Sequence, residues 1–415
     1  MGAFFLFVAL LSLAGHALFY AWAKRTVPWV ARHPRGFAAV VAVVAMCVPL
    51  SRLFAHGLVP FFSIEALALL IGGFLSVLFT TIALGGVRIA AWLRGVKPAV
   101  EASAKVETSI DPATETMKTE TVKTETVTKE EPEAISRRVM IERGVGVLTY
   151  GVVGSVLGWG VVRGRHDYQI EEVVVRIPGL SPKLDGYTIA QVSDLHAGML
   201  VDAAEFDRGF AFVRAAKPDL VVATGDLIDH DAAFAPMLAR KLAELGARDG
   251  TVAILGNHDY YAGAKRVEQA MRDAGVNLLI NEGHLVQRDA GPGLLIAGLD
   301  DYAGYRYGRG PDLEGLLRRL EPAVREEAPR VVLAHQPPFF DELYGRAALQ
   351  LSGHTHGGQI NLGVPSAKLV GMRYVAGRYG GPSSTLWVNR GFGVAGPPAR
   401  VGAPPEITKI VLVAG

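Results

Sequence analysis

Cysteine is almost absent from this sequence. The single cysteine, Cys47, excludes an intrachain disulfide, and the lack of paired cysteines excludes the zinc sites that are built on them. An excess of charge of one sign is absent as well, because 42 Lys and Arg residues stand against 40 Asp and Glu residues, a formal net charge of +2. The composition therefore indicates no nucleic-acid partner, and it leaves the redox compartment open.

The mean hydropathy of the whole chain is +0.27, and its apolar residues are concentrated in the N-terminal part. Charged residues are missing there from several long apolar runs. The runs Gly2–Trp22, Ala66–Val87 and Gly144–Val162 are each about as long as a membrane-spanning helix, and Gly36–Leu50 is shorter. The first run lacks the basic start of a cleaved signal peptide. We therefore expect three membrane spans within residues 1–97 and a fourth within 138–165, with buried core helices as the alternative.

Basic residues gather beside these runs in a pattern that predicts a topology. One group lies between the first two runs, one follows the third and one precedes the fourth: Lys24, Arg25, Arg32 and Arg35; Arg88, Arg94 and Lys97; Arg137, Arg138 and Arg143. Because Lys and Arg are retained on the cytoplasmic side of a membrane, these segments are expected there. The N-terminus and everything after Val162 then lie outside. We expect a multi-pass inner-membrane protein whose C-terminal domain faces the periplasm.

A stretch without aromatic residues, Val100–Ala134, follows the third run. It contains the near-repeat TETMKTETVKTETVTKEE and too few apolar side chains to offset the entropy that ordering would cost. We expect residues 98–137 to form a disordered linker in the cytoplasm. The fourth span, 138–165, and a globular domain, 166–415, complete the expected domain organisation.

After Arg165 the sequence takes on the texture of an α/β domain, in which short β-rich runs alternate with helical segments. The helical segments are expected at Ala203–Ala216, Phe234–Leu245, Ala264–Ala274 and Asp312–Leu320. The strand candidates are EEVVVRI, YTIAQVSD, DLVVATGD, TVAILGNHD, GLLIAGLD, RVVLAHQP, ALQLSGHTH, TLWVNRG and EITKIVLV. About 250 residues suffice for one such domain.

Five of the strand candidates end in residues of the types that bind metal ions. These residues are Asp194 and His196; Asp226 and Asp229; Asn257, His258 and Asp259; His335; and His354 with His356. One such residue after a strand is more often a capping or hydrogen-bonding group, but five of the 11 histidines fall within these short motifs. Since open α/β sheets place their sites beyond the strand ends, the series predicts a single site.

The chemistry that such a series favours is the hydrolysis of a phosphate ester. The negative charge of the ester repels a nucleophile, and water ionises too weakly to attack it at neutral pH. Two divalent cations about 3.5–4 Å apart overcome both difficulties, because they bind the phosphate oxygens and lower the pKa of a bridging water. A site of this kind needs a carboxylate between the ions, with imidazole and oxygen ligands around them.

The segment SGHTHGGQ, Ser352–Gln359, places two histidines one residue apart among glycines. Alternate residues of an extended segment point the same way, so we expect His354 and His356 to face the two ions, one each. Gly353, Gly357 and Gly358 would allow backbone and phosphate to approach closely. A glycine-rich turn with incidental histidines is the alternative for this segment taken alone.

The ordered series DLH, GDLID, GNHD, AHQP and SGHTHGGQ resembles the calcineurin-like metallophosphoesterase superfamily. The similarity is greatest to its bacterial membrane-associated branch, which includes phosphodiesterases of the twin-arginine-exported type and the UDP-2,3-diacylglucosamine pyrophosphatases. It covers Tyr168 to the C-terminus, including the tail VNRGFGVAGPPARVGAPPEITKIVLV. The fold that the resemblance implies is a four-layer α/β/β/α sandwich with the metals at one edge, here preceded by an N-terminal helical transmembrane region.

The resemblance also implies a role for each motif residue. One ion would be held by Asp194, His196 and His356, the other by Asn257, His335 and His354, with Asp226 bridging the two. His258 would donate a proton to the leaving oxygen or stabilise charge on the phosphoryl group, and Asp229 would orient a ligand. Mixed imidazole, carboxylate and amide ligands favour Mn, Fe, Zn or Co over Mg or Ca.

These expectations predict a membrane-anchored phosphoesterase with two divalent metal ions, in which a metal-bound hydroxide attacks a phosphodiester or pyrophosphate. The substrate class is a phosphate ester that is lipid-linked or nucleotide-linked. Two alternatives remain open. One is a UDP-2,3-diacylglucosamine pyrophosphatase of lipid A biosynthesis, which the expected topology opposes because its substrate is cytoplasmic. The other is a non-catalytic membrane receptor or transport-associated protein whose phosphoesterase-like domain only binds a ligand.

Overall fold

The structure is a computed structural model that describes residues 2–54, 59–94, 136–288, 290–291, 293–320, 322–369 and 371–415. The predicted disordered linker, Val100–Ala134, lies outside the described residues. By its internal contacts the chain divides into a helical unit, 1–46 with 66–153, and a second unit, 47–65 with 154–415. The second unit contains the α/β domain, and the predicted boundary at residue 166 stays a prediction.

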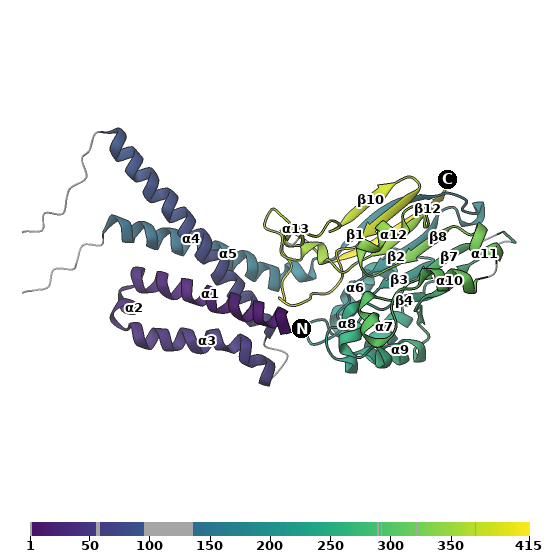
Figure 1. The fold of residues 1–415 in the computed structure, drawn as a ribbon, viewed down its shortest axis with the longest axis horizontal. Helices are drawn as coiled ribbons and strands as arrows, with labels where there is room; N and C mark the ends of the chain where they lie inside the picture. The colour runs from purple at the N-terminus through teal and green to yellow at the C-terminus, as the bar shows by residue number, and fades with distance from the viewer. Residues whose placement is uncertain are drawn as a thin grey trace, which may run out of the picture. The chain divides into compact units, whose positions relative to one another are not determined.

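Long helices make up the N-terminal part of the chain (Figure 1). Their bounds are α1 Gly2–Thr26, α2 Pro28–Arg32, α3 Pro34–Phe54, α4 Val59–Leu93 and α5 Arg137–Val162. Glycine permits the close approach of α1 and α4, because a Cβ added at Gly15 would lie 2.8 Å from the carbonyl oxygen of Ala66. Small residues at helix contacts are typical of helices that pack in a membrane.

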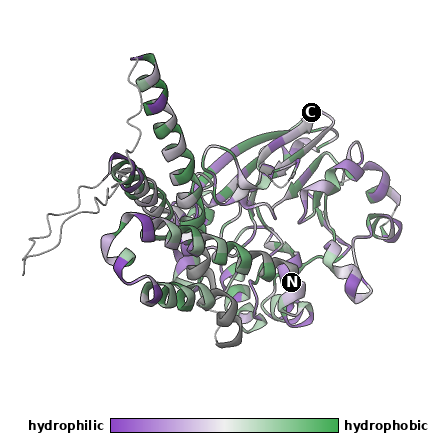
Figure 2. Ribbon diagram, turned by 60° about the vertical axis from the view of Figure 1, so that its left-hand side comes forward, coloured by the Kyte–Doolittle hydropathy of each residue, from purple (hydrophilic) through white to green (hydrophobic). Residues whose placement is uncertain are grey.

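Two of the described helical stretches, Ile64–Leu93 and Arg137–His166, are long and apolar enough to cross a membrane. They contain the third and fourth predicted spans. The second predicted span falls in α3, where the apolar stretch Pro34–Met46 is shorter than a membrane crossing requires. Figure 2 shows hydrophobic residues along the N-terminal helices. Four membrane crossings are therefore not established, and a membrane association through two helices is what the described residues support.

The end of α1 and the start of α5 meet through charged groups within the helical unit. Glu142, a buried carboxylate, lies 3.5 Å from Arg25 Nε and 3.0 Å from Arg138 Nε. Arg143 Nε also donates to the carbonyl oxygen of Thr26 at 2.8 Å. The basic residues that flank the first and fourth predicted spans therefore lie at the same end of the helical unit.

Two six-stranded sheets form the α/β domain. The first has the order β1 (Gln169–Ile177), β12 (Glu406–Ala414), β2 (Tyr187–Val192), β3 (Leu220–Thr224), β4 (Thr251–Ile254) and β5 (Asn277–Leu278). The second has the order β10 (Gly377–Gly381), β11 (Ser384–Val388), β9 (Leu349–Ser352), β8 (Arg330–Leu333), β7 (Leu294–Gly298) and β6 (Glu282–Val286).

The strands that precede the motifs run parallel to one another within each sheet. In the first sheet β2 pairs with β3 and β3 with β4, with Ile189 opposite Leu220 and Val221 opposite Thr251. In the second sheet β8 pairs with β9, with Val331 opposite Leu349. Parallel strands end at the same edge of a sheet, so the loops that follow them are gathered at one edge of each sheet.

Apolar cores between neighbouring layers hold the domain together as four layers, in the order helix, sheet, sheet, helix. The sheets pack against each other through side chains such as Ile189 and Leu351. Phe206 and Val267 pack helices against the outer face of the first sheet, and Leu316 does so for the second. The helices are α6 Ala203–Ala215, α7 Ala235–Ala243, α8 Asn257–Ala262, α9 Ala264–Asp273, α10 Leu313–Arg319, α11 Pro322–Glu327, α12 Phe340–Leu343 and α13 Ser366–Leu369.

The apolar strand runs follow from this burial on both faces. All five residues of β3, LVVAT, are buried, which explains why the sequence there does not alternate between apolar and polar residues. Four of the observed helices lie within two residues of their predicted ends. The helix predicted from Asp312 begins at Leu313, because the Asp312 side chain accepts from the N–H of Gly315 and caps the helix.

Candidate metal centre

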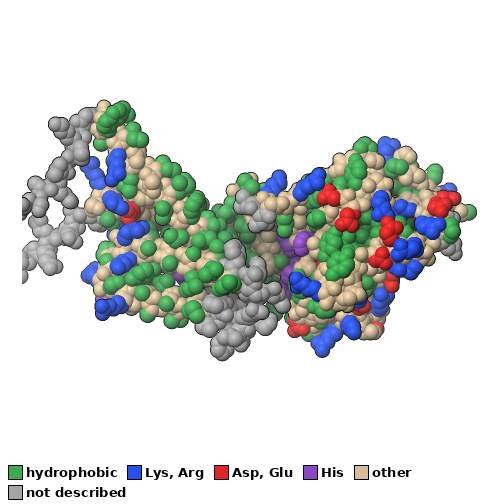
Figure 3. All heavy atoms as spheres, viewed as in Figure 1, with side chains coloured by type: hydrophobic (Ala, Val, Ile, Leu, Met, Phe, Trp, Pro, Cys, Tyr) green, Lys and Arg blue, Asp and Glu red, His purple; other side chains and the backbone are tan. Residues whose placement is uncertain are grey.

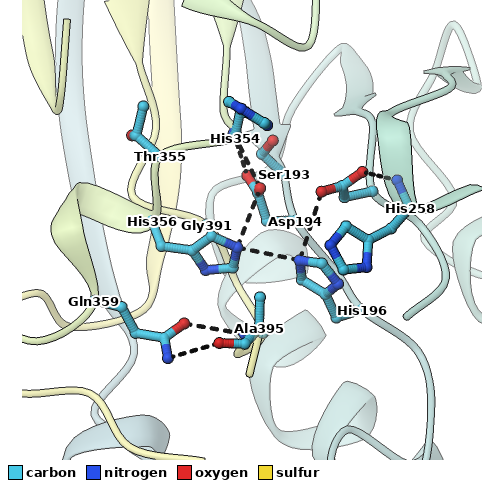
Figure 4. Close-up of polar contacts among 12 residues, drawn as sticks. Ser193, Asp194, His196, His258, His354, Thr355, His356, Gln359, Gly391 and Ala395 are labelled. Atoms are coloured by element: carbon cyan, nitrogen blue, oxygen red, sulfur yellow. Dashed lines mark hydrogen bonds and ion pairs between the residues drawn. The ribbon is translucent and has the colours of Figure 1, made fainter. Parts of the chain in front are cut away.

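The predicted ligands lie directly beyond the strand ends. Asp194 and His196 follow β2, and Asp226 follows β3. Asn257 and His258 begin α8 after β4, His335 follows β8, and His354 and His356 follow β9. The hydrogen bond from Gly353 N to the carbonyl oxygen of His335, 3.1 Å, joins two of these loops. The structure thus brings residues from both sheets together, and Figure 4 shows several of these side chains facing one another.

One group consists of Asp194, His196 and His356, whose nearest donor atoms lie within 4.8 Å of one another. His356 Nε2 is 3.4 Å from Asp194 Oδ1 and 3.1 Å from His196 Nε2. All three side chains are buried. Two imidazole nitrogens and a carboxylate oxygen at this spacing form a site that suits a divalent transition-metal ion.

A second group consists of Asp226, His335 and His354. His335 Nε2 lies 3.2 Å from Asp226 Oδ2 and 3.2 Å from His354 Nδ1. His354 therefore approaches this group with its Nδ1 atom, whereas His356 approaches the first group with its Nε2 atom. The two histidines of SGHTHGGQ belong to different groups.

Asp226 stands between the two groups. Its Oδ2 atom is 3.7 Å from His196 Nε2 and 3.2 Å from His335 Nε2, while its Oδ1 atom accepts the N–H of His258 at 2.8 Å. Burial alone would raise the pKa of this carboxyl, but the surrounding histidines hold its pKa well below the usual value. Asp226 is therefore a carboxylate. Its Oδ1 atom is fixed by a backbone N–H, and its Oδ2 atom faces a histidine of each group.

Asn257 places an amide oxygen without a protein partner at the start of α8. Its Oδ1 atom is buried and accepts no hydrogen bond from any described residue. A buried polar atom without a partner costs on the order of 1–3 kcal/mol. That cost is removed if Oδ1 coordinates a cation. The buried, unpartnered Oδ1 atom is therefore the observation that fits these residues to a metal ion.

Backbone carbonyls orient two of the imidazoles. His335 Nδ1 lies 2.8 Å from the carbonyl oxygen of Thr224, and His258 Nδ1 lies 2.9 Å from that of Asp229. Each contact requires a proton on Nδ1 and leaves Nε2 for the site. Burial alone would lower the pKa of His258, but the carboxylates of Asp226 and Asp229 raise its pKa to about 9.

Asp229 lies beside the first group rather than within it. Its Oδ1 atom is 3.6 Å from His196 Nδ1 and 3.5 Å from His258 Nδ1. This arrangement suits the predicted role of orienting neighbouring imidazoles. His230 stacks on His258 with ring centroids 5.2 Å apart.

The segment after β9 is not extended, so the reasoning by which His354 and His356 point the same way was wrong. His354 has φ 72° and His356 has φ 52°, and a 3₁₀ turn begins at His356. Left-handed backbone turns the two imidazoles towards different groups. Of the eight described non-glycine residues with positive φ, five are predicted ligands: Asp194, His196, Asp226, His354 and His356. Each costs about 1–3 kcal/mol, and such strain is concentrated at functional sites.

Two residues support the site in roles that the sequence did not predict, and one of them, Asp259, had been named among the residues of metal-binding type. Asp259 is buried and accepts from the backbone N–H groups of Gly256, Leu227 and Ile228, which ties the loop after β3 to the loop after β4. Its place three residues after Gly256, as an acid in the first turn of a helix, was a usable signal. Arg400, fully buried, places its Nη2 atom 3.2 Å from His356 Nδ1. No local pattern in the glycine- and proline-rich tail indicates that contact.

Known proteins resemble the region that contains these residues. A family model described as calcineurin-like phosphoesterase matches residues 187–358. A Bacillus subtilis protein named uncharacterized metallophosphoesterase YkuE is 33% identical over 291 residues, which cover 67% of this chain and 98% of that protein.

Two further matches differ in kind. A protein of Bos taurus named transmembrane protein with metallophosphoesterase domain is 29% identical over 297 residues, and the match covers 67% of this chain and 64% of that protein. Among solved structures, the sulfate thiohydrolase SoxB of Thermus thermophilus matches with a TM-score of 0.36 and 14% identity, over 56% of this chain and 57% of that one.

Proposed function

The chain belongs to the calcineurin-like phosphoesterase family, and on that basis we propose that it is a membrane-anchored phosphoesterase that uses two metal ions to hydrolyse phosphodiester or pyrophosphate bonds. Membership makes it a metal-dependent phosphoric ester hydrolase. The two-ion assignment, the bond type and the anchoring are the parts that we propose.

The observation that carries the proposal is the position of Asp226. One oxygen of this carboxylate faces His196 in the first group and His335 in the second, at 3.7 and 3.2 Å. A single ion would need only one of these groups, and a structural zinc site would be closed by four ligands without a shared carboxylate. Two adjacent ions explain why two groups of donors meet at one side chain.

Two ions bound there would hold the phosphate oxygens and lower the pKa of an attacking water. We propose that Asp194, His196 and His356 hold one ion, that Asn257, His335 and His354 hold the other, and that Asp226 bridges them. His258 is placed for a different task. The carbonyl oxygen of Asp229 fixes its ring through Nδ1, which leaves Nε2 to give a proton to the leaving oxygen.

The test is hydrolysis of bis-p-nitrophenyl phosphate by the full-length protein purified in detergent and supplied with Mn, Fe, Zn or Co. Metal-dependent release of p-nitrophenol is expected. The mixed imidazole, carboxylate and amide ligands favour these ions over Mg and Ca. Complete inactivity with all four metals, on this diester and on a nucleotide pyrophosphate, would refute the proposal.

His258→Ala separates catalysis from binding alone. A general acid contributes about 10²–10⁴-fold, so the variant should keep its bound metal and lose activity by that factor. His230→Ala is the matched control, because it alters the neighbouring, more exposed histidine. Equal rates for His258→Ala and the unsubstituted protein would remove His258 from the mechanism.

We also propose that the domain after α5 lies on the periplasmic side of the inner membrane. The clustering of Arg25, Arg138 and Arg143 at one end of the helical unit supports this, because the positive-inside rule assigns that end to the cytoplasm. A topology reporter fused to the C-terminus should be active only outside the cytoplasm. A cytoplasmic signal would instead favour an enzyme of the UDP-2,3-diacylglucosamine type.

A further inference from the structure

The end of α5 is built into the loop that supports the metal centre. Within the second unit, Arg400 N donates to the carbonyl oxygen of Gly160 at 3.1 Å. A Cβ added at Gly164, in the short turn that follows α5, would overlap the carbonyl oxygen of Arg400. The helix end and this loop are therefore in backbone contact, without side chains between them.

Arg400 extends this contact to a predicted ligand. Its guanidinium is fully buried and donates from Nε to the carbonyl oxygen of Gly393 at 2.8 Å and from Nη1 to that of Ala403 at 3.0 Å. Its Nη2 atom lies 3.2 Å from His356 Nδ1. Arg400 thus contacts both the end of the apolar helix, through its backbone, and the predicted ligand His356, through its side chain.

Two loops that carry predicted ligands also border the end of α5, and both expose apolar side chains. Met199, three residues after His196, is 72% exposed, and the adjoining Leu200 and Val201 line a small cavity together with Arg165 and His166. The second loop follows His356 and exposes Leu362 by 52% and Val364 by 53%.

The second loop is held against the helix end through Val401. Asn361 N donates to the carbonyl oxygen of Val401 at 2.7 Å, and a Cβ added at Gly160 would lie 2.7 Å from Val401 Cγ2. The second loop therefore adjoins α5 near Gly160, and the first adjoins Arg165 and His166 just after the helix ends. Figure 3 shows histidine side chains at one edge of the α/β domain.

The last turns of α5 show the same character. Trp159 is 50% exposed and Val162 is 77% exposed, and Arg163 and Arg165 follow them directly. A Trp beside basic residues at the end of an apolar helix is the pattern of a membrane–water interface. Water-exposed apolar side chains on three adjacent segments are costly unless something apolar covers them.

We propose that Trp159, Val162, Met199, Leu362 and Val364 form one bilayer-contact surface, and that the metal centre takes its phosphodiester or pyrophosphate from a lipid headgroup. Continuity with a helix that is long and apolar enough to span argues for the bilayer as the occupant. Met199 is only three residues from His196, a span of at most about 10 Å. The headgroup layer is about 5–8 Å thick, so a centre within this reach of a residue that contacts the bilayer can meet a lipid headgroup.

The bilayer-contact surface is tested first by depth, independently of activity. Met199→Cys, Leu362→Cys and Val174→Cys are made one at a time in full-length protein that carries Cys47→Ser. Each variant is labelled with a fluorophore and placed in nanodiscs of phosphatidylethanolamine and phosphatidylglycerol that contain nitroxide lipids. Val174 is the matched control, since it is 54% exposed but lies on β1, five residues from the start of the strand. We expect quenching at 199 and 362 and none at 174. If quenching occurs at none of these positions, or equally at all three, the proposed bilayer-contact surface is wrong.

The lipid substrate is tested with two diesters that differ only in their chain, hexadecyl p-nitrophenyl phosphate and ethyl p-nitrophenyl phosphate. In nanodiscs we expect kcat/KM to be about tenfold or more higher for the hexadecyl ester. Met199→Ser with Val364→Ser should reduce that ratio, and Val174→Ser should leave it unchanged.

This inference rests on the proposed phosphoesterase function, and the two fail differently. If neither ester is hydrolysed, the lipid substrate is overturned, and the assays with bis-p-nitrophenyl phosphate and a nucleotide pyrophosphate decide whether the phosphoesterase proposal fails with it. The quenching result still decides whether the surface contacts the bilayer. Hydrolysis of both esters at equal kcat/KM retains the phosphoesterase and overturns the lipid substrate.

Discussion

At the scale of single residues, the candidate centre depends on a carboxylate, Asp226, that its neighbours hold in place. Asp226 combines a backbone N–H on one oxygen with two imidazoles on the other. Its neighbour Gly256 has no room for a side chain, because an added Cβ would overlap the Asp226 carboxylate. The shared carboxylate is thus held by its surroundings rather than by its own conformational freedom.

Replacing Asp226 by Asn should abolish the two-ion site. The amide keeps an oxygen for the N–H of His258 but loses the negative charge between the groups, so we expect less than one ion per chain to be retained and activity to fall by at least about 10³-fold. Metal analysis by mass spectrometry and initial rates check this. Asp207→Asn, an exposed carboxylate paired with Lys241, is the control. Two retained ions in the Asp226 variant would contradict the bridging role.

Glu205 is a second residue whose charge depends on the fold. Burial alone would raise the pKa of Glu205, but hydrogen bonds from Tyr168, His166 and Arg208 lower it below the usual value. The distances to Tyr168 Oη and His166 Nδ1 are 2.6 and 2.7 Å. A carboxyl with a lowered folded-state pKa stabilises the protein above its unfolded pKa, and that stabilisation is lost as the pH falls through the folded pKa.

We therefore expect Glu205→Gln to destabilise the protein at neutral pH by about 2 kcal/mol. The difference in unfolding free energy between the variant and the unsubstituted protein should shrink as the pH is lowered below about 4. Glu205 is then protonated and uncharged, as glutamine is at every pH. Thermal unfolding between neutral and acidic pH measures this. A difference that stays constant over the range would show that the charge of Glu205 does not stabilise the fold.

Among the elements of the α/β domain, nine strands and four helices were predicted from the sequence, whereas the edge strands β5, β6 and β10, the short helices and the turns were not. Burial on both faces produces the continuous apolar runs of β3 and β4, and capping residues such as Asp312 mark helix starts. The segment after β9 was predicted as extended and is left-handed at His354 and His356. Local propensity disfavours that backbone in histidine, so only contacts with the rest of the fold can impose it.

The junction of α5 with the Arg400 loop provides a test at the scale of an element. Gly164→Ala places a methyl group on the carbonyl oxygen of Arg400, so we expect a loss of about 1–3 kcal/mol in stability. Gly158→Ala has open space at the added Cβ and should be neutral or stabilising by up to about 1 kcal/mol. Thermal unfolding in detergent compares them. Equal stability of the two variants would exclude the close packing of α5 on this loop.

For the molecule as a whole, metal ions should act as stabilising ligands, because the groups around Asp226 are assembled only in the folded state. A ligand at 100 times its Kd stabilises a folded protein by about 2.7 kcal/mol. We expect the Tm to fall after treatment with a chelator and to rise again when Mn is added. Calorimetry of the full-length protein measures this, with Asp226→Asn as the control. A Tm that is insensitive to metal would argue against a preformed centre.

The sequence by itself determined the residue types at the strand ends and the apolar helices, because metal chemistry requires particular donors and a bilayer requires particular lengths. The order of motifs along the chain was therefore sufficient for the family and the ligand candidates. Only the tertiary structure decided which oxygen of Asp226 is shared, which nitrogen His354 presents and that Arg400 lies behind His356. These are contacts between residues distant in the chain, and their geometry depends on how two sheets and a helix end pack, for which no local pattern exists.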